Sequence, residues 1–290
     1  MGTTQRINPG VANEPNWGDL SNSITYVAST VEQERKLEEE EKREEEKEKE
    51  REKKQENQQP INTNTTKRYA KIENRRGEHI KSAYRNLIKT GGGRQSITSG
   101  KSPSIGKAGL KSANRIAGLL SGVGTNGIEK TLTDLGFGSL SGKSFKDVID
   151  FLLIYCSESN QGMDETAANK ASCEIMKELE VQSANDLAKF QEIVKELVDG
   201  KGLADTLCKF WGLYIFEHLS QRFEEKIQQQ KGEDISRETF KIIKDDILGR
   251  VKVLNTKREV SKIDWKSQDG KKEIENIFDS IIKIICNEKN

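Results

Sequence analysis

The sequence of 290 residues is poor in the residues that build metal sites and disulfide frameworks. Its two histidines, His79 and His218, stand far apart, and its four cysteines form no C-x-x-C pair, so the spacing does not match a zinc site. We therefore expect no metal and no cofactor. Each cysteine lies in an apolar helical pattern, which predicts buried, reduced thiols in a cytosolic protein. These are Cys156, Cys173, Cys208 and Cys286.

Long apolar runs are also missing. No run reaches the roughly 18 residues that a membrane-spanning helix needs, and the polar N-terminus does not have the pattern of a signal peptide. We expect a cytoplasmic protein without a membrane partner.

Hydrophobic residues make up only 33% of the chain, and charged residues make up another 33%. Such a composition predicts that part of the chain does not fold by itself, which leaves about 220 residues for a compact body. The net charge of +1 is a cancellation between an acidic-leaning tract and a basic one. It therefore says little about the partners of the protein.

Residues 1–31 show no sustained apolar period, and we expect a disordered N-terminal arm. Removal of the initiator Met would leave the α-amine of Gly2, which is unhindered and, with a pKa near 8, partly unprotonated at neutral pH. This amine is a usable nucleophile. The myristoylation signature is not met, because Arg6 stands where Ser or Thr is required. Trp17 is the one aromatic residue of the segment EPNWGDL, and it either anchors a partner or packs onto its own domain.

Residues 32–66 form a charged spacer and a link. The spacer is almost wholly Glu, Lys and Arg, with i,i+4 pairs such as Glu38 with Lys42 that can support an exposed helix. Apolar a and d positions are missing, so we do not expect a coiled coil. Pro60 breaks any helix and begins a flexible link to the body.

The stretch 67–115 is strongly basic, with 13 Lys and Arg residues against two acids, Glu73 and Glu78. Two basic helical segments flank a Gly/Ser-rich loop at 91–109, where we expect exposed backbone N–H groups and mobile lysines that suit phosphate. The alternative is a solvated hinge without a ligand. The candidate phosphate or nucleic-acid contacts are Arg75, Arg76, Lys81, Arg85, Lys89, Arg94, Lys101, Lys107, Lys111 and Arg115.

Two nucleotide-binding motifs are present only in part. Residues 100–102 match the end of a Walker A motif, but Gln95 stands where that motif needs glycine. Gly122, Gly124 and Gly127 spell G-x-G-x-x-G, yet they follow a helical pattern instead of a strand. We predict a helix-to-helix turn here, with Thr125 or Asn126 capping the next helix.

The rest of the chain predicts helices near 125–135, 144–156, 164–180, 183–198, 236–254 and 272–286, with Asp164 and Ser183 as N-caps. The longest apolar stripe runs from Leu203 to Ile227 and predicts the central packing helix, with His218 as a core histidine on its edge. No strand pattern is visible. We therefore predict an all-α domain over 67–290, built of about eight to ten helices.

Several segments in this order resemble the QatB family of the bacterial Qat anti-phage defence system. They are the MGTT start, a tail with Pro15 and Trp17, a helix with Tyr84 and Arg85 that leads to GGGR, and residues 106–117. The resemblance continues more loosely through GLLSGV, LGFGSLSGKSFKDVIDFLL and MDETAANKASCEIMKEL. The charged spacer departs from the family pattern and looks inserted.

The resemblance implies a non-enzymatic subunit whose partners are an ATPase (QatA), a QueC-like enzyme (QatC) and a TatD-like nuclease (QatD). QueC-like enzymes handle 7-deazapurine nitriles, and the family picture is that QatC modifies the N-terminus of QatB. Carried over to this sequence, Gly2 is the acceptor, and Thr3 and Thr4 are recognised by the modifying enzyme. Pro15 and Trp17 would contribute to partner docking.

Two functions from different classes follow from these observations. The first is a non-catalytic defence subunit, modified at Gly2, whose helical body docks partner proteins. The alternative is a nonspecific nucleic-acid-binding protein that acts through 67–115. An enzyme is a third reading, but the sequence places no nucleophile, base and oxyanion donors together.

Overall fold

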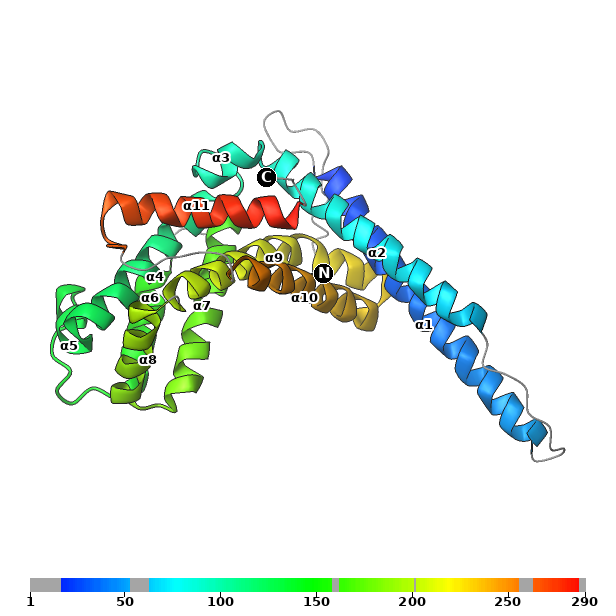
Figure 1. The fold of residues 1–290 in the computed structure, drawn as a ribbon, viewed down its shortest axis with the longest axis horizontal. Helices are drawn as coiled ribbons and strands as arrows, with labels where there is room; N and C mark the ends of the chain where they lie inside the picture. Colours follow the sequence, from blue (N-terminus) through cyan, green and yellow to red (C-terminus); the bar gives the residue numbers. More distant parts are fainter. Residues whose placement is uncertain (1–16, 53–62, 158–161, 201, 256–262, 287–290) are drawn as a thin grey trace, which may run out of the picture. The chain divides into compact units, whose positions relative to one another are not determined.

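The computed structural model describes residues 17–52, 63–157, 162–200, 202–255 and 263–286 (Figure 1). Within these ranges the secondary structure consists of eleven α-helices and no strand, which confirms the all-α prediction. The helices are α1 (Gly18–Glu52), α2 (Thr63–Thr90), α3 (Arg94–Thr98), α4 (Lys107–Asn126), α5 (Ile128–Asp134), α6 (Phe145–Cys156), α7 (Met163–Ser183), α8 (Leu187–Asp199), α9 (Gly202–Lys231), α10 (Glu233–Asn255) and α11 (Gln268–Ile285).

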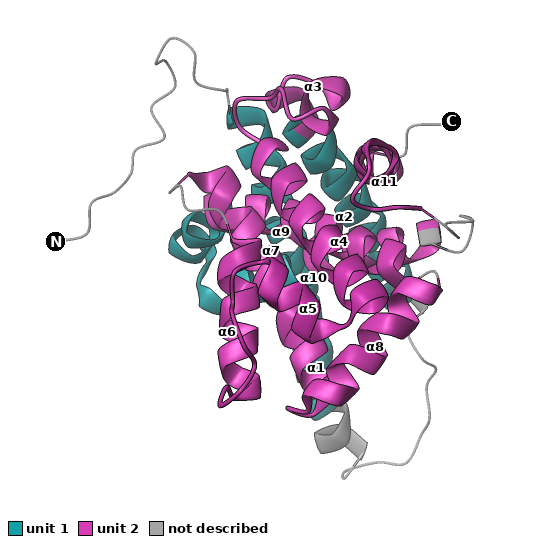
Figure 2. Cartoon of the chain, turned by 90° about the vertical axis from the view of Figure 1, so that its left-hand side faces the viewer, with its two compact units in different colours: residues 1–87, 223–242 teal, residues 88–222, 243–290 magenta. Residues whose placement is uncertain are grey.

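The chain divides into two compact units, shown in teal and magenta in Figure 2. Unit 1 comprises residues 1–87 and 223–242, and unit 2 comprises residues 88–222 and 243–290. The division falls inside α2, α9 and α10, and not at the link that the sequence predicts before residue 67.

Helix α1 of unit 1 begins at Gly18, so residues 18–31 are helical where the sequence predicted part of a disordered arm. The cause is a buried stripe at helical spacing that consists of Leu20, Ile24, Val27 and Val31. Serine and threonine residues between these positions make the helical spacing of the apolar residues hard to recognise in the sequence. Several of their hydroxyls donate to carbonyls one turn earlier, as Thr25 does to Ser21 at 2.9 Å, so they fit a helix.

The charged tract that follows continues α1 and lies antiparallel to α2 (Figure 1). Tyr69 of α2 donates to the Glu41 carboxylate at 2.7 Å, and Arg76 pairs with Glu34. Leu37 is an apolar residue in this seam and is 2% exposed. The described part of the spacer therefore packs against α2. The sequence did not predict this contact, because polar pairs stand where a coiled coil would have most of its apolar a and d residues.

The Gly/Ser-rich loop of unit 2 is a packed segment, which corrects the prediction of exposed backbone N–H groups. It contains α3, and its Ile97 and Ile105 side chains are fully buried. The backbone N–H groups of Lys101 and Ser102 both donate to the Ser96 carbonyl, at 2.9 and 3.0 Å. These N–H groups are therefore not available to a phosphate.

The part of α9 that belongs to unit 2, residues 202–222, is largely buried, as its apolar stripe predicts. Residues 210–220 are buried on all sides of the helix. The Trp211 ring stacks on Phe278 of α11 with 3.7 Å between ring centroids and 5° between ring planes. Gly109 lets α4 approach this cluster, because a Cβ at that position would lie 2.6 Å from the Trp211 ring. The core thus depends on close backbone approach as well as on large side chains.

The G-x-G-x-x-G glycines have packing roles. Gly122 and Gly124 lie inside α4, where an added Cβ would come within 2.9 Å of Thr131 and 2.8 Å of Val198 respectively. Only Gly127, with φ of 81°, forms the turn to α5. Thr125 and Asn126 are still helical, so neither caps α5 as predicted. The N–H of Ile128 instead donates to the Gln191 side chain at 3.0 Å.

Two predicted N-caps are also corrected. Ser183 is the last residue of α7, and Asp186 caps α8 by accepting from Ala188 and Lys189 at 2.8 and 3.1 Å. Asp164 lies in the first turn of α7 behind the N-cap Gly162. Its carboxylate caps a different helix, as described below.

The four cysteines are free thiols, and three of them are buried while Cys173 is half-buried. Burial raises the pKa of the Cys156 thiol to about 12, so this thiol is not a nucleophile at neutral pH. Among the described helices, none combines the length and the apolar character that crossing a bilayer requires.

Candidate functional site

The N-terminal candidates Gly2, Thr3, Thr4 and Pro15 lie outside the described residues. Trp17 is the first residue that is described. Its side chain is half-buried, and its carbonyl accepts the N–H of Ser21 at 2.9 Å, so it stands at the entry to α1.

The ten basic candidates do not all belong to one unit. Arg75, Arg76, Lys81 and Arg85 lie in unit 1, and the six from Lys89 to Arg115 lie in unit 2. Several of them serve the fold. In unit 1, Lys81 pairs with Glu78 at 2.7 Å, and Arg76 pairs with Glu34. In unit 2, Arg94 pairs with Asp279 at 3.1 Å. Arg115 donates to the Ser157 carbonyl at 2.6 Å. The exposed members include Arg75, Arg85, Lys101 and Lys107.

The helix N-terminus within the basic stretch, at the start of α4, is already bound to a carboxylate of the protein. The N–H of Gly106 donates to Asp164 Oδ1 at 3.3 Å, and the N–H of Ala108 donates to Oδ2 at 2.8 Å. These are the donors that an anion would use at a helix N-terminus. Asp164 thus accepts from donors that one of the two interpretations of this loop assigned to a phosphate.

The Asp164 carboxylate also binds two side chains of the central helix α9. The hydroxyl of Tyr214 donates to Oδ1 and itself accepts the N–H of Gly106 at 2.5 Å. His218 Nε2 lies 3.1 Å from the same Oδ1. Tyr214 and His218 are both buried. One carboxylate thereby connects α4, α7 and α9.

Burial and hydrogen bonding act in opposite directions on this cluster. Burial by itself would raise the pKa of Asp164, but hydrogen bonds from His218, Tyr214 and Ala108 outweigh it, and the pKa is lowered. Burial lowers the pKa of His218 despite the neighbouring carboxylate. Neutral His218 therefore donates from Nε2 to Asp164. Among the described residues its Nδ1 is buried without a hydrogen-bond partner.

The Asp164 cluster joins three helices of unit 2 through buried hydrogen bonds. The Tyr214 proton is directed to Asp164, and burial raises the pKa of Tyr214 well above its usual value. The sequence could not reveal the cluster, because Asp164 is 50 residues from Tyr214 and 54 residues from His218. No local motif joins residues at such separations.

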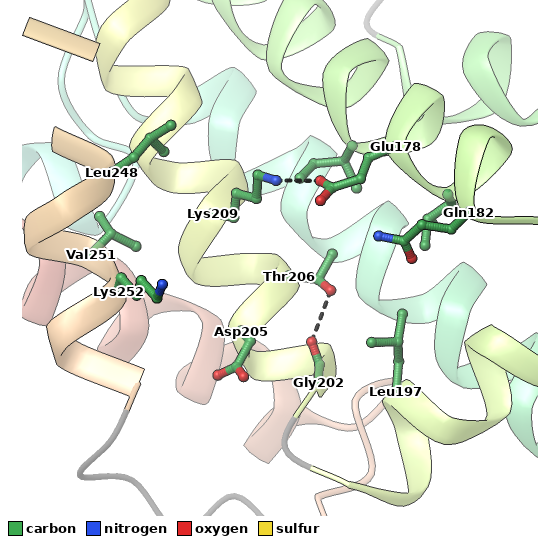
Figure 3. Close-up of a pocket in the computed structure, with 12 residues that line it drawn as sticks. Glu178, Gln182, Leu197, Gly202, Asp205, Thr206, Lys209, Leu248, Val251 and Lys252 are labelled. Carbon is green, nitrogen blue, oxygen red and sulfur yellow. Dashed lines mark hydrogen bonds and ion pairs between the residues drawn. The ribbon is translucent and has the colours of Figure 1, made fainter. Parts of the chain in front are cut away.

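A pocket of about 460 Å³ opens between α7, α9 and α10, with α8 at one end (Figure 3). Its apolar lining comes from Ile175, Leu179, Leu197, Leu248 and Val251, and its polar lining from Glu178, Gln182, Asp205, Thr206, Lys209 and Lys252. The volume is within the range of small-ligand sites, roughly 300–1,000 Å³. All of these residues belong to unit 2.

The polar groups of the pocket are partly engaged with each other. Lys209 pairs with Glu178 across the space between α9 and α7, and the Thr206 hydroxyl donates to the Gly202 carbonyl at 2.8 Å (Figure 3). The lining has no aromatic ring, so it offers no surface for stacking a base. The arrangement suits an aliphatic group that enters between charged helix faces.

Comparison with protein-family models places the chain in a known family. The model described as Qat anti-phage system associated protein QatB covers residues 98–285, nearly two thirds of the chain. The chain belongs to the QatB family. The Asp164 cluster and the pocket lie inside the matched span, whereas α1 and α2 precede it. Searches of curated proteins and of solved structures gave no match. Family membership makes this protein a component of the Qat anti-phage system.

The Asp164 cluster predicts acid sensitivity. The unfolded chain binds a proton at His218 near the ordinary pKa of 6.5, whereas the folded state resists it. The contribution of His218 to the free energy of unfolding should therefore be fully present above pH 6.5. It should be lost as the pH drops below that value. A second loss follows below 3.8, the ordinary pKa of Asp164, because its folded pKa is lower. Denaturant unfolding of the full chain between pH 8 and pH 3 measures both.

The matched variants for this measurement are His218→Gln and His79→Gln. The first removes the buried imidazole and should reduce the fall in the free energy of unfolding between pH 7 and pH 5. The second changes a half-buried histidine of unit 1 and should keep that loss. An unchanged pH profile in His218→Gln would contradict the assignment of a neutral, buried His218.

Proposed function

We propose that this QatB-family protein is a non-catalytic subunit of the Qat anti-phage system, and that its N-terminal glycine is modified by a QueC-like partner. Membership of the QatB family is the observation that carries the proposal. The partners are the QueC-like enzyme, the ATPase and the TatD-like nuclease of the same system. We place the complex in the cytoplasm.

The acceptor is the α-amine of Gly2. A glycine amine carries no side chain that would hinder its entry into a deep active site, and it can add to an activated acyl or nitrile carbon. Thr3 and Thr4 follow directly and are the residues that the modifying enzyme would recognise. Pro15 and Trp17 lie between this acceptor and α1. They are our candidates for docking, with Trp17 half-buried at the entry to α1.

The helical body supplies a second contact with partners through the pocket between α7, α9 and α10. Its floor includes Ile175, Leu179 and Val251, each less than 5% exposed, with Leu248 more accessible. Aliphatic side chains of a partner would gain free energy by leaving water here, roughly 25 cal/mol for each Å² buried. Binding, not turnover, is the role that this lining supports, since Lys209 and Thr206 are engaged within the protein.

The exposed basic residues favour one alternative, nonspecific binding of nucleic acid. Arg75, Arg85, Lys101 and Lys107 could contact phosphates. These residues belong to two units, and the helix N-terminus among them is occupied by Asp164. A phosphate-driven interaction would weaken steeply as salt rises, whereas docking into an apolar pocket would not.

Modification of Gly2 predicts an added mass on the N-terminal peptide. The full chain is expressed with and without the QueC-like partner, and fragmentation spectra locate the added mass. We expect it on Gly2 only when the partner is present, and we expect it to disappear in Gly2→Pro, whose ring hinders the amine.

The control variant Gly10→Ala changes the same arm without touching the acceptor and should keep the added mass. An unmodified N-terminus in both expression samples would contradict the acceptor role of Gly2.

Docking into the pocket predicts different effects for two substitutions on α10. Leu248→Glu places a charge in the pocket, while Val253→Glu changes a residue of the same helix that is 61% exposed and outside the lining. Co-purification with the co-expressed ATPase, QueC-like enzyme and nuclease is measured. We expect Leu248→Glu to lower recovery of at least one component about tenfold or more, and Val253→Glu to leave it unchanged.

Circular dichroism melting of both variants separates lost docking from lost folding. Equal recovery of all three components with folded Leu248→Glu would contradict this use of the pocket.

A further inference from the structure

A second groove lies on unit 1, between α1 and α2. Its volume is about 370 Å³. Each helix contributes four residues at positions i, i+3, i+4 and i+7, which share one face of a helix. They are Gln33, Lys36, Leu37 and Glu40 from α1 and Arg68, Lys71, Ile72 and Arg75 from α2. Two helices that present such faces side by side form a seat for a third helix.

The floor of the groove is apolar. Leu37 is 2% exposed and Ile72 is half-buried. A helix that lies here can cover the exposed part of Ile72, while Leu37 closes the floor beneath it. This favours an amphipathic helix over a purely polar ligand.

The walls of the groove are basic. Four of its eight residues are cations and one is an acid, Glu40, which pairs with Arg68 at 3.0 Å. Lys36 pairs with Glu32 at 2.7 Å. Lys71 and Arg75 are exposed, and among the described residues no acid forms an ion pair with either. They stand four positions apart on α2, about 6 Å along the axis. Two carboxylates one turn apart on a partner helix would match them.

The same hairpin already holds helices next to the groove. Within unit 1, Lys231 at the end of α9 pairs with Glu32 at 2.6 Å, and Glu238 of α10 accepts from Arg35 at 2.7 Å. Lys36 and Leu37 follow directly and line the groove. The groove therefore continues a surface of α1 that already packs against helices of its own chain.

Charge around the groove argues against nucleic acid as its ligand. Residues 38–41 and 44–46 of α1 are all glutamates, and most are exposed. A duplex carries a negative charge at about every 1.7 Å of its axis and would meet this acidic surface along its length. A short helix brings only a few carboxylates, at positions that can face Lys71 and Arg75.

We propose that this groove binds an amphipathic helix of a Qat partner protein, with an apolar residue on Ile72 and two acidic residues one turn apart against Lys71 and Arg75. The site is separate from Gly2 and from the pocket between α7, α9 and α10. This proposal rests on the proposed function in one respect, that the partner helix belongs to a component of the Qat system.

The test uses the full chain co-expressed with the ATPase, the QueC-like enzyme and the nuclease. A photoreactive benzoyl-phenylalanine replaces Gln33, an exposed lining residue, or Glu38, an exposed residue of α1 outside the lining. After irradiation, mass spectrometry identifies the cross-linked peptide. We expect position 33, and not position 38, to cross-link a helical segment of one Qat component that carries spaced apolar and acidic residues.

Charge reversal tests the recognition itself. The double variant Lys71→Glu with Arg75→Glu should reduce cross-linking from position 33 about tenfold, as expected for the loss of two ion pairs. Arg43→Glu with Lys47→Glu makes the same change in net charge at exposed positions of α1 outside the groove and should leave cross-linking unchanged. Thermal melting of both variants confirms that they are folded.

The proposal is overturned by cross-links from position 33 to nucleic acid or to a second copy of this chain, or by yields no higher than at position 38. Equal losses from the two double variants would also overturn it. The mass of the Gly2 peptide is measured on the same samples. A modified Gly2 without the cross-link refutes the groove alone, and a cross-link with an unmodified Gly2 refutes the acceptor role alone.

Discussion

The carboxylate of Asp164 is the contact on which the packing of unit 2 depends. Helix α4 begins after Gly106, whose φ of 110° and close approach to the Ile97 carbonyl leave no room for a Cβ. A glycine cannot cap a helix with a side chain. Asp164 provides the missing acceptor from α7 and also binds Tyr214 and His218 of α9. The start of one helix is thereby held by two others.

This arrangement engages several backbone donors of the basic loop within the protein. The loop between α2 and α4 is anchored by buried Ile97 and Ile105 on one side and by Asp164 on the other. A basic sequence rich in glycine and serine is compatible with anion binding and with tight packing alike. Tight packing is what the hydrogen bonds of this loop favour. Its backbone N–H groups donate to carbonyls and to a carboxylate of the protein itself.

The two units carry different kinds of surface. Unit 2 contains an apolar pocket between α7, α9 and α10, within the span that matches the QatB family. The α1–α2 part of unit 1 precedes that span and presents a basic groove with an apolar floor. Both surfaces suit the binding of protein segments.

Periodicity was sufficient to predict the helical class and the central role of α9, since its apolar residues recur along the whole stripe. It was not sufficient for α1, where short polar residues separate Leu20, Ile24 and Val27 and conceal the period. The partners of Asp164 could not be predicted, because they are far away in sequence. The pocket and the groove were missed for a related reason, as each is made by helices that meet only after folding.

A double-mutant cycle of Asp164→Asn and Tyr214→Phe, read as the free energy of unfolding of the full chain, tests the role of the carboxylate most directly. If Asp164 joins α4 and α9 through Tyr214, each single variant is strongly destabilising and the second change costs much less once the first is made. The predicted coupling is at least about 1 kcal/mol. Additive effects, within about 0.5 kcal/mol, would contradict the dependence of unit 2 on this contact.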